Sequence, residues 1–171
     1  MTDKVNDDSK ILWAPWRMEY IVNCDEPADC IFCTKPKENN DKENLIVYRG
    51  AFNFIIMNRY PYNNGHLMIV PYKHTCELPQ LNSEEKSEWI DLVELSQVVL
   101  NKVMKPHGFN IGMNMGRVAG AGIAEHLHFH IVPRWDGDTN FMPVLGHAKV
   151  VSEGLEATWL KVTYELGKIL K

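Results

Sequence analysis

Three histidines, His126, His128 and His130, alternate with apolar residues in one short run of the chain. In a β-strand this spacing places all three imidazoles on one face and the apolar side chains on the other. Three interpretations are open: a solvent-facing polar stripe, a metal site completed by a nearby carboxylate, and a nucleophilic site in which imidazole attacks phosphorus. A solvent-facing stripe explains least well why these residues are histidines, because histidine is the side chain with acid–base chemistry near neutral pH.

A loop of small residues, 116–122, leads directly into the histidines. Its members Gly116, Gly120, Ala121 and Gly122 let backbone N–H groups approach an anion closely. Such donors can stabilise phosphoryl oxygens while a neutral imidazole attacks, and a covalent phosphoramidate divides one difficult displacement into two. The loop lacks the lysine of a Walker loop and the helix start of a Rossmann turn, so those nucleotide-binding folds are disfavoured.

Cys30 and Cys33 form a Cys-x-x-Cys motif that supplies two of the four ligands of a structural zinc ion, and His74 is a candidate for a third. Two alternatives stay open: free buried thiols, and a redox dithiol without the βαβ context of thioredoxin. A structural zinc ion is the expected cofactor, and no organic cofactor is expected.

Length and composition favour one globular domain. The chain has 171 residues, of which 45% are hydrophobic and 23% are charged. A net charge of −4 without a basic cluster disfavours nucleic acid polymers as partners and leaves a small phosphate ligand possible. We expect a cytoplasmic protein without membrane attachment, because the polar N-terminus does not resemble a signal peptide and no apolar run is long enough to span a bilayer.

Hydrophobic patterning predicts an α+β domain with a five-stranded antiparallel sheet, a long helix and a C-terminal helix. The long helix spans 82–104, begins with a capping signal at Asn82 and ends before Pro106. The C-terminal helix is indicated by apolar residues spaced from Leu155 to Ile169. The expected strands are 45–48, 52–58, 66–71, 109–115 and 127–133. Within the single domain 1–171, residues 1–44 form an N-terminal segment that carries the Cys-x-x-Cys motif, and 45–171 form the catalytic core.

The run 126–132, His-x-His-x-His followed by two apolar residues, resembles the signature of the histidine triad (HIT) superfamily. Further stretches are similar to the diadenosine tetraphosphate phosphorylase branch of that family: 12–20, 58–71, 110–114, 132–135 and 137–141. The resemblance implies a HIT-like fold and nucleotidyl transfer or hydrolysis at an α-phosphorus.

The resemblance also implies roles for individual residues. His128 would be the nucleophile, and His130 would assist at phosphate or leaving-group oxygens. Asn58 would hold the ribose, Asn114 the phosphate, and His66 would line the nucleotide pocket.

Zinc-carrying family members use the cysteine pair, a histidine at the position of His74, and the first triad histidine. By that pattern, His126 would be a zinc ligand. Because it lies on the catalytic strand, it could serve either as a zinc ligand or as an active-site group. Family members commonly pair across a two-fold axis, so a homodimer is expected.

One departure from the family concerns the acceptor of the nucleotidyl group. Hydrolase members usually carry glutamine four residues before the first triad histidine, where this chain has Gly122. The missing side chain leaves space beside the nucleotide and favours inorganic phosphate as acceptor, with ADP and ATP as products of diadenosine tetraphosphate. Two alternatives stay open: a hydrolase of nucleoside phosphoramidates or dinucleoside polyphosphates that uses water, and a nucleotide-binding sensor with negligible turnover.

Overall fold

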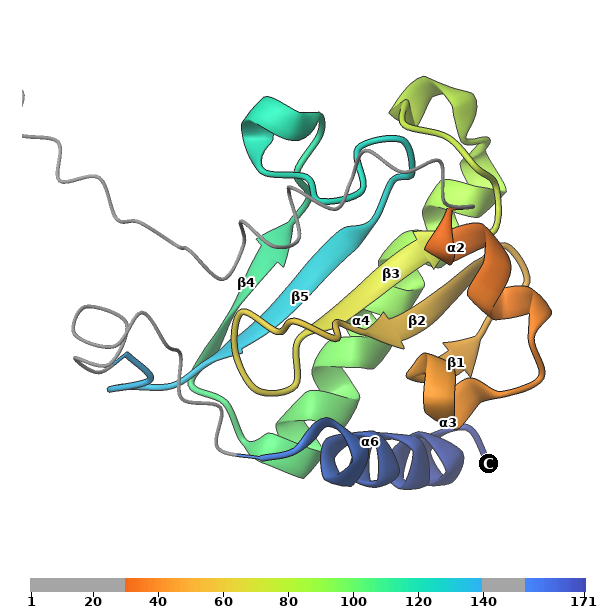
Figure 1. The fold of residues 1–171 in the computed structure, drawn as a ribbon. Helices are drawn as coiled ribbons and strands as arrows, with labels where there is room; N and C mark the ends of the chain where they lie inside the picture. Colours follow the sequence, from red (N-terminus) through yellow and green to blue (C-terminus); the bar gives the residue numbers. More distant parts are fainter. Residues whose placement is uncertain (1–29, 140–152) are drawn as a thin grey trace, which may run out of the picture.

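A computed structural model describes residues 30–139 and 153–171 and confirms the predicted α+β class. Its sheet is antiparallel and has the strand order β1-β2-β3-β5-β4 (Figure 1). The strands are β1 (Ile46–Arg49), β2 (Asn53–Met57), β3 (Leu67–Pro71), β4 (Gly108–Gly112) and β5 (Phe129–Arg134). The helices of four residues or more are α2 (Ile31–Thr34), α3 (Asp41–Asn44), α4 (Ser83–Met104) and α6 (Leu155–Ile169). The family-like stretch 12–20 and the end of the stretch 137–141 lie outside the described residues.

The long helix α4 begins and ends as its sequence predicts. Asn82 and Glu85 form a reciprocal capping box at its N-terminus. At the other end Lys105 adopts a left-handed conformation immediately before Pro106. The buried face is Trp89, Leu92, Ser96, Val99 and Leu100. The indole N–H of Trp89 donates to the carbonyl of Ile69, which fastens α4 to the middle of β3.

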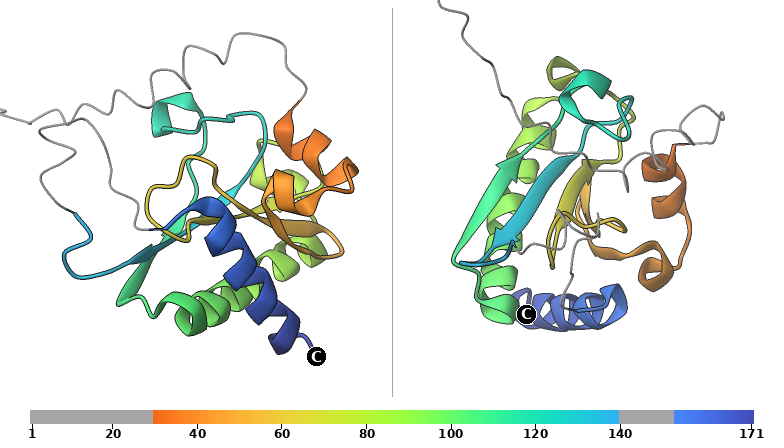
Figure 2. Two further views of the ribbon diagram at one scale, coloured as in Figure 1. Left: turned by 60° about the horizontal axis from the view of Figure 1, so that its bottom comes forward. Right: turned by 60° about the vertical axis from the view of Figure 1, so that its left-hand side comes forward.

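The helices divide between the two sides of the sheet. Helix α4 covers one face, and the short helices α2 and α3 lie on the opposite side (Figure 2). Helix α6 packs against α4 and β1, where the indole N–H of Trp159 donates to the carbonyl of Ile46 at 2.9 Å. Among the described residues, no helix has both the length and the apolar composition of a membrane span.

The histidine strand starts later than expected, because β5 begins at Phe129 and not at residue 127. Its ladder with β3 pairs Leu67 with Ile131 and Ile69 with Phe129. Beyond this point β3 ends at Pro71, which has no N–H to donate. Instead, the Leu127 N–H donates to the carbonyl of Thr75 at 2.7 Å. His126 and His128 therefore lie just before the strand, outside its ladder.

A carboxylate on α4 closes the turn between β1 and β2. Glu88 accepts hydrogen bonds from the backbone N–H groups of Ala51, Phe52 and Asn53 and from the Asn53 side chain, at 2.6–2.8 Å. The same turn requires a glycine, because a Cβ on Gly50 would lie 2.6 Å from a Glu88 oxygen. Burial alone would raise the pKa of Glu88, but these four hydrogen bonds outweigh it and lower the pKa.

Glu88→Ala is therefore expected to lower the free energy of unfolding by roughly 2 kcal/mol, because it leaves the buried Asn53 amide groups without their acceptor. Since folding lowers the pKa of Glu88, its stabilisation is present above the unfolded pKa and is lost as pH falls through the folded value. Urea unfolding at pH 7 and pH 3 measures both effects. Glu94→Ala, at an exposed position of the same helix, is the control; an equal loss in the two variants would contradict the assignment.

Candidate active site

His126 is buried and is held at both ring nitrogens. Its Nε2 lies 2.8 Å from the carbonyl oxygen of Pro71, so this nitrogen carries the proton and donates it. The Nδ1 atom is then unprotonated and faces the sulfur atoms of Cys30 and Cys33 at 3.3 and 3.6 Å. Burial lowers the pKa of His126 to about 4, which keeps the imidazole neutral at pH 7. The first triad histidine thus presents a lone pair to the Cys-x-x-Cys motif.

His128 takes the opposite tautomer. Its Nδ1 lies 2.8 Å from the carbonyl oxygen of His126, so the proton is on Nδ1 and the lone pair is on Nε2. Burial lowers the pKa of His128, and the hydrogen bond to the carbonyl opposes that shift only in part. A neutral imidazole with its Nε2 lone pair free of the proton is the form that attacks an electrophile.

His130 receives its orientation from His66, which sequence reasoning placed in the same pocket. The Tyr62 backbone N–H donates to Nδ1 of His66 at 3.1 Å, so the proton of a neutral His66 is on Nε2. That nitrogen lies 2.9 Å from Nδ1 of His130 and donates to it. His130 consequently carries its own proton on Nε2. Its ring centroid lies 4.9 Å from that of His128, so a ring N–H stands beside the imidazole that has its lone pair on Nε2.

Two positions that sequence reasoning missed hold the histidines in place. Phe32 is buried in α2, and its ring centroid lies 5.5 Å from that of His126 and 5.2 Å from that of His128. The sequence signal that could have identified Phe32 was its position between Cys30 and Cys33. The second is the carbonyl of Pro71, which no side-chain pattern reveals because the acceptor belongs to the backbone.

The metal ligands predicted from the sequence converge, and we call Cys30, Cys33, His74 and His126 the ligand cluster. Their ligand atoms all lie within 4.8 Å of one another. The shortest separations between them run from 3.2 to 3.6 Å. A tetrahedral zinc shell, with Zn–S of about 2.3 Å and Zn–N of about 2.0–2.1 Å, spaces its ligands by roughly 3.3–3.8 Å. The cluster therefore fits a zinc ion and would leave no ligand position for substrate.

Two further predicted site residues, Asn58 and Asn114, form hydrogen bonds with backbone groups. The Asn58 N–H donates to the carbonyl of His66 at 3.0 Å, and its side-chain oxygen accepts from the Tyr60 N–H. Asn114 donates to the carbonyl of Gly120, which joins the end of β4 to the loop.

The loop itself contains a short 3₁₀ turn, with positive φ at Gly116 and Gly120. The N–H groups of Gly120 and Ala121 donate to carbonyls of the loop. Phosphate binding by Gly120, Ala121 and Gly122 stays a prediction.

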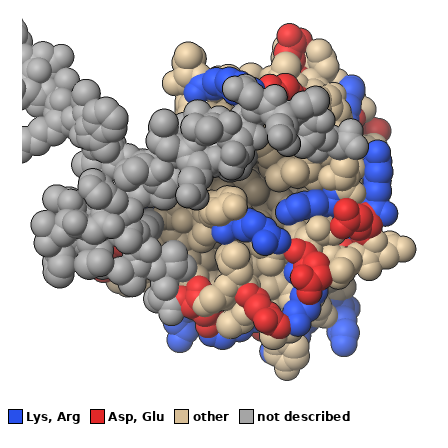
Figure 3. All heavy atoms as spheres, in the orientation of Figure 1, with Lys and Arg blue, Asp and Glu red and all other residues tan. Residues whose placement is uncertain are grey.

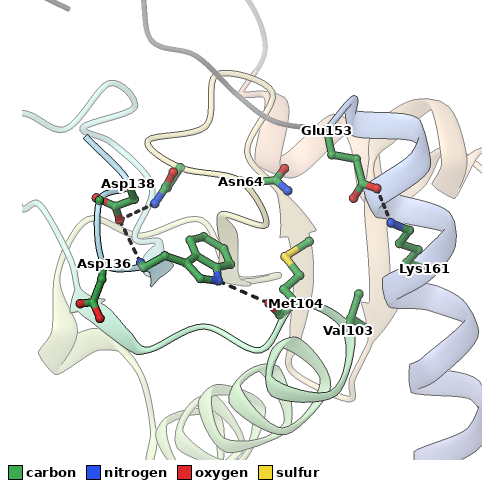
Figure 4. A pocket seen from close by; sticks show the side chains of 10 residues that line it. Asn64, Val103, Met104, Asp136, Asp138, Glu153 and Lys161 are labelled. Carbon is green, nitrogen blue, oxygen red and sulfur yellow. Dashed lines mark hydrogen bonds and ion pairs between the residues drawn. The ribbon is translucent and has the colours of Figure 1, made fainter. Parts of the chain in front are cut away.

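A cavity of about 570 Å³ lies beside the segment that follows β5 (Figure 4). It is bordered by the segment after β5, the end of α4 and the start of α6, with Asp136, Met104 and Lys161 among its walls. Several of its polar groups are paired with each other: Glu153 with Lys161, and Asp138 with Asn63. Because His128 precedes β5 and the cavity follows it, the two are separated by about 20 Å of strand.

Comparison with known proteins identifies the family. A model of the HIT domain matches residues 39–137, which is more than half of the chain. A solved "hypothetical histidine triad nucleotide-binding protein" from Sulfolobus tokodaii superposes with a TM-score of 0.66 at 26% identity, covering 82% of this chain and 93% of that one. A zinc-bound histidine triad family protein from Mycobacterium smegmatis shares the fold, with a TM-score of 0.65 at 21% identity over 82% and 95% of the two chains.

Two curated relatives carry the names of enzymes. "AP-4-A phosphorylase" of Mycobacterium tuberculosis is 40% identical over 159 residues, covering 89% of this chain and 82% of the relative. "Adenosine 5'-monophosphoramidase" of Candida albicans is 28% identical over 116 residues, covering 66% and 74%. The domain match, the identity to these enzymes and the buried histidine cluster lead to one conclusion: the chain belongs to the HIT family and is an enzyme of that family.

Proposed function

We propose that the protein cleaves dinucleoside polyphosphates, with diadenosine tetraphosphate as the substrate, through a covalent nucleotidyl intermediate on His128. The observation that carries this proposal is the hydrogen bond from Nδ1 of His128 to the carbonyl of His126, which directs the Nε2 lone pair toward an electrophile. The 40% identity to an enzyme named AP-4-A phosphorylase supports the choice of substrate.

The proposed reaction has two displacements. In the first, Nε2 of His128 attacks the α-phosphorus, a P–N bond forms, and the P–O bond to the departing ATP breaks. The Nε2 proton of His130 stabilises the oxygen on which charge develops. In the second, an oxygen of inorganic phosphate attacks the same phosphorus, the P–N bond breaks, and ADP leaves.

Phosphate as the acceptor is supported by two features. Gly122 has no side chain where hydrolases of the family place glutamine, and the M. tuberculosis relative is named a phosphorylase. The second candidate reaction uses water, because the relative from C. albicans is named a phosphoramidase. The two reactions share the first displacement and differ in the second.

We also propose that the ligand cluster holds one structural zinc ion. When bound, the ion would fix the Cys-x-x-Cys segment against the end of β3 and the start of the catalytic run. His126 would then contribute Nδ1 to the metal while its Nε2 stays hydrogen-bonded to Pro71, a common arrangement for metal-bound histidine. Its own backbone carbonyl orients His128, so the site supports catalysis through position only.

A homodimer is the proposed assembly. Strand β4 is an edge of the sheet formed by the described residues; Ile111 on this strand and Met115, three residues after it, are exposed. A second copy could cover this apolar edge and extend the sheet. Sedimentation velocity at micromolar concentration is expected to give twice the 19.7 kDa mass of the chain; a monomer would contradict the proposal.

His128→Ala is expected to lower turnover of diadenosine tetraphosphate by roughly a thousandfold or more and to keep nucleotide affinity within a few-fold. The nucleophile is lost, whereas other groups bind the ligand. Rapid acid-free quenching of the wild type and peptide mapping should locate an acid-labile adenylyl adduct on residue 128. His107→Ala, at an exposed histidine outside the cluster, is the control. Near-wild-type turnover or an adduct elsewhere would reassign the nucleophile.

Phosphate-dependent cleavage is expected to give ADP and ATP. With ¹⁸O-labelled inorganic phosphate, the label should appear in the β-phosphoryl group of ADP, because the acceptor oxygen attacks the adenylyl phosphorus. Chromatography and mass spectrometry of the products measure both points. Formation of AMP and ATP at one rate, with or without phosphate, would show that water is the acceptor.

Removal of two zinc ligands should lower the stability of the fold more than it lowers the rate of the chemical step. The double variant Cys30→Ser and Cys33→Ser is expected to lose one zinc ion per chain and about 3 kcal/mol of stability, which corresponds to a fall in Tm of roughly 6–12 °C. Metal analysis and calorimetry measure these quantities. Cys76→Ser, at an exposed cysteine outside the cluster, should change neither. A metal-free wild type with a Tm equal to that of the double variant would overturn the zinc assignment.

A further inference from the structure

The segment between β2 and β3 supplies the backbone N–H that fixes the tautomers of two histidines. It spans 58–66, and we call it the β2–β3 turn. The Tyr62 N–H donates to Nδ1 of His66 at 3.1 Å, and Nε2 of His66 lies 2.9 Å from Nδ1 of His130. The Tyr62 ring also packs against both imidazoles, with centroid distances of 4.7 and 5.5 Å. The proton on Nε2 of His130 therefore depends on where this turn holds its backbone.

Asn63 anchors the β2–β3 turn to the segment that contains and follows the end of β5. Its buried side-chain amide donates to the carbonyl of Pro133 at 3.0 Å and to the Asp138 carboxylate at 2.8 Å (Figure 4). Its backbone carbonyl accepts the N–H of His66 at 3.2 Å. Because Asn63 follows Tyr62 directly, a shift of this anchor moves the N–H that His66 accepts.

Asp138 is itself held by groups at the end of β5. Its carboxylate accepts two hydrogen bonds from the Arg134 guanidinium, at 2.6 and 2.8 Å, and one from the Trp135 N–H at 3.1 Å. On the face that Figure 3 shows, Lys and Arg side chains lie next to Asp and Glu side chains at the surface, where ion pairs contribute little to stability. The Asp138 side chain is only 8% exposed. Its hydrogen bonds are thus better protected from water and orient Asn63 more firmly.

Packing fixes the end of the same turn. Gly65 has a positive φ, and a Cβ at this position would lie 2.5 Å from the sulfur of Met104 at the end of α4. The Met104 carbonyl accepts from the indole N–H of Trp135 at 3.3 Å. The turn is therefore fixed at Gly65 by close packing and in its middle, next to Tyr62, by the hydrogen bonds of Asn63.

The hydrogen bond between the two imidazoles can run in either direction, and the two directions give different tautomers. If Nδ1 of His66 carried the proton, its Nε2 would accept from Nδ1 of His130. Nε2 of His130 would then be a lone pair, and no proton would face the oxygen on which charge develops in the proposed reaction. The Tyr62 N–H disfavours this state, because it can donate only to an unprotonated Nδ1 of His66.

We propose that Asn63 and Asp138 are positioning residues for the reaction. They hold the Tyr62 N–H against His66, which in turn keeps a proton on Nε2 of His130. The inference rests on the proposed function, in which that proton stabilises the oxygen of the leaving group. Since the two anchors act through His130 and not through contact with the substrate, their loss lowers kcat and leaves KM nearly unchanged.

Kinetics measure this role. Asn63→Ala and Asp138→Ala should each lower kcat for diadenosine tetraphosphate roughly tenfold or more, with KM within about twofold. Asp138→Asn keeps an oxygen for the Asn63 amide and should retain most of kcat. In a His130→Ala background, Asn63→Ala should cause no further loss, because its effect passes through His130. Asn64→Ala is the matched control, at the adjacent asparagine, whose side chain accepts from Thr158 on α6.

Nitrogen NMR tests the tautomers without any substrate. In protein labelled with ¹⁵N-histidine, long-range proton–nitrogen spectra distinguish a proton on Nδ1 from one on Nε2. His66 and His130 should both carry it on Nε2 in the wild type, and part of each population should move to Nδ1 in Asn63→Ala and Asp138→Ala. Either alanine variant suffices if the other does not fold.

The two measurements separate this inference from the proposed function. If the wild type cleaves no dinucleoside polyphosphate, the proposed function fails, and the spectra still decide whether Asn63 and Asp138 set the tautomers. Wild-type tautomers in a folded alanine variant would overturn the inference. An equal fall of kcat in Asn64→Ala, or an additive loss in the His130→Ala background, would overturn it as well.

Discussion

The hydrogen bond between the imidazole of His126 and the carbonyl of Pro71 fixes much of the site. It requires the proton of His126 on Nε2 and therefore leaves Nδ1 as a lone pair directed at Cys30 and Cys33. It also sets the position of the His126 backbone, whose carbonyl orients His128. One residue thus connects the end of β3, the Cys-x-x-Cys segment and His128, the proposed nucleophile.

Hydrogen bonds also fix which ring nitrogen carries the proton in the neighbouring histidines. A backbone N–H of Tyr62 fixes the proton of His66, and His66 in turn fixes the proton of His130. The outcome is a lone pair on one nitrogen of His128 and a proton on one nitrogen of His130, in rings whose centroids are 4.9 Å apart. His128 and His130 therefore differ in tautomer, although both are buried imidazoles two residues apart.

The sequence predicted those features that follow from local periodicity or from specific motifs. The five strands, the capping box at Asn82 and the convergence of Cys30, Cys33, His74 and His126 are present in the structure. The start of β5 was misplaced, because alternation of apolar residues continues past the point where Pro71 ends the ladder. Sequence periodicity does not reveal the contacts that backbone carbonyls make. It also does not reveal contacts between distant segments, such as those of Phe32 and Glu88. Only the folded chain brings these groups together.

His126 and His128 each donate to a backbone carbonyl rather than to a carboxylate, and this choice suits nucleophilic chemistry. A carboxylate beside a buried imidazole raises its pKa and favours the imidazolium, which serves a general base that must hold a proton. A neutral carbonyl orients the ring with a much weaker preference for the charged form, so burial still lowers the pKa of His128. In the proposed intermediate, phosphorus on Nε2 would make the ring cationic, and the same carbonyl would accept the stronger hydrogen bond from Nδ1. In the proposed reaction the hydrogen bond would therefore orient the neutral imidazole first and then stabilise the charged intermediate more than the resting state, as differential binding along a reaction requires.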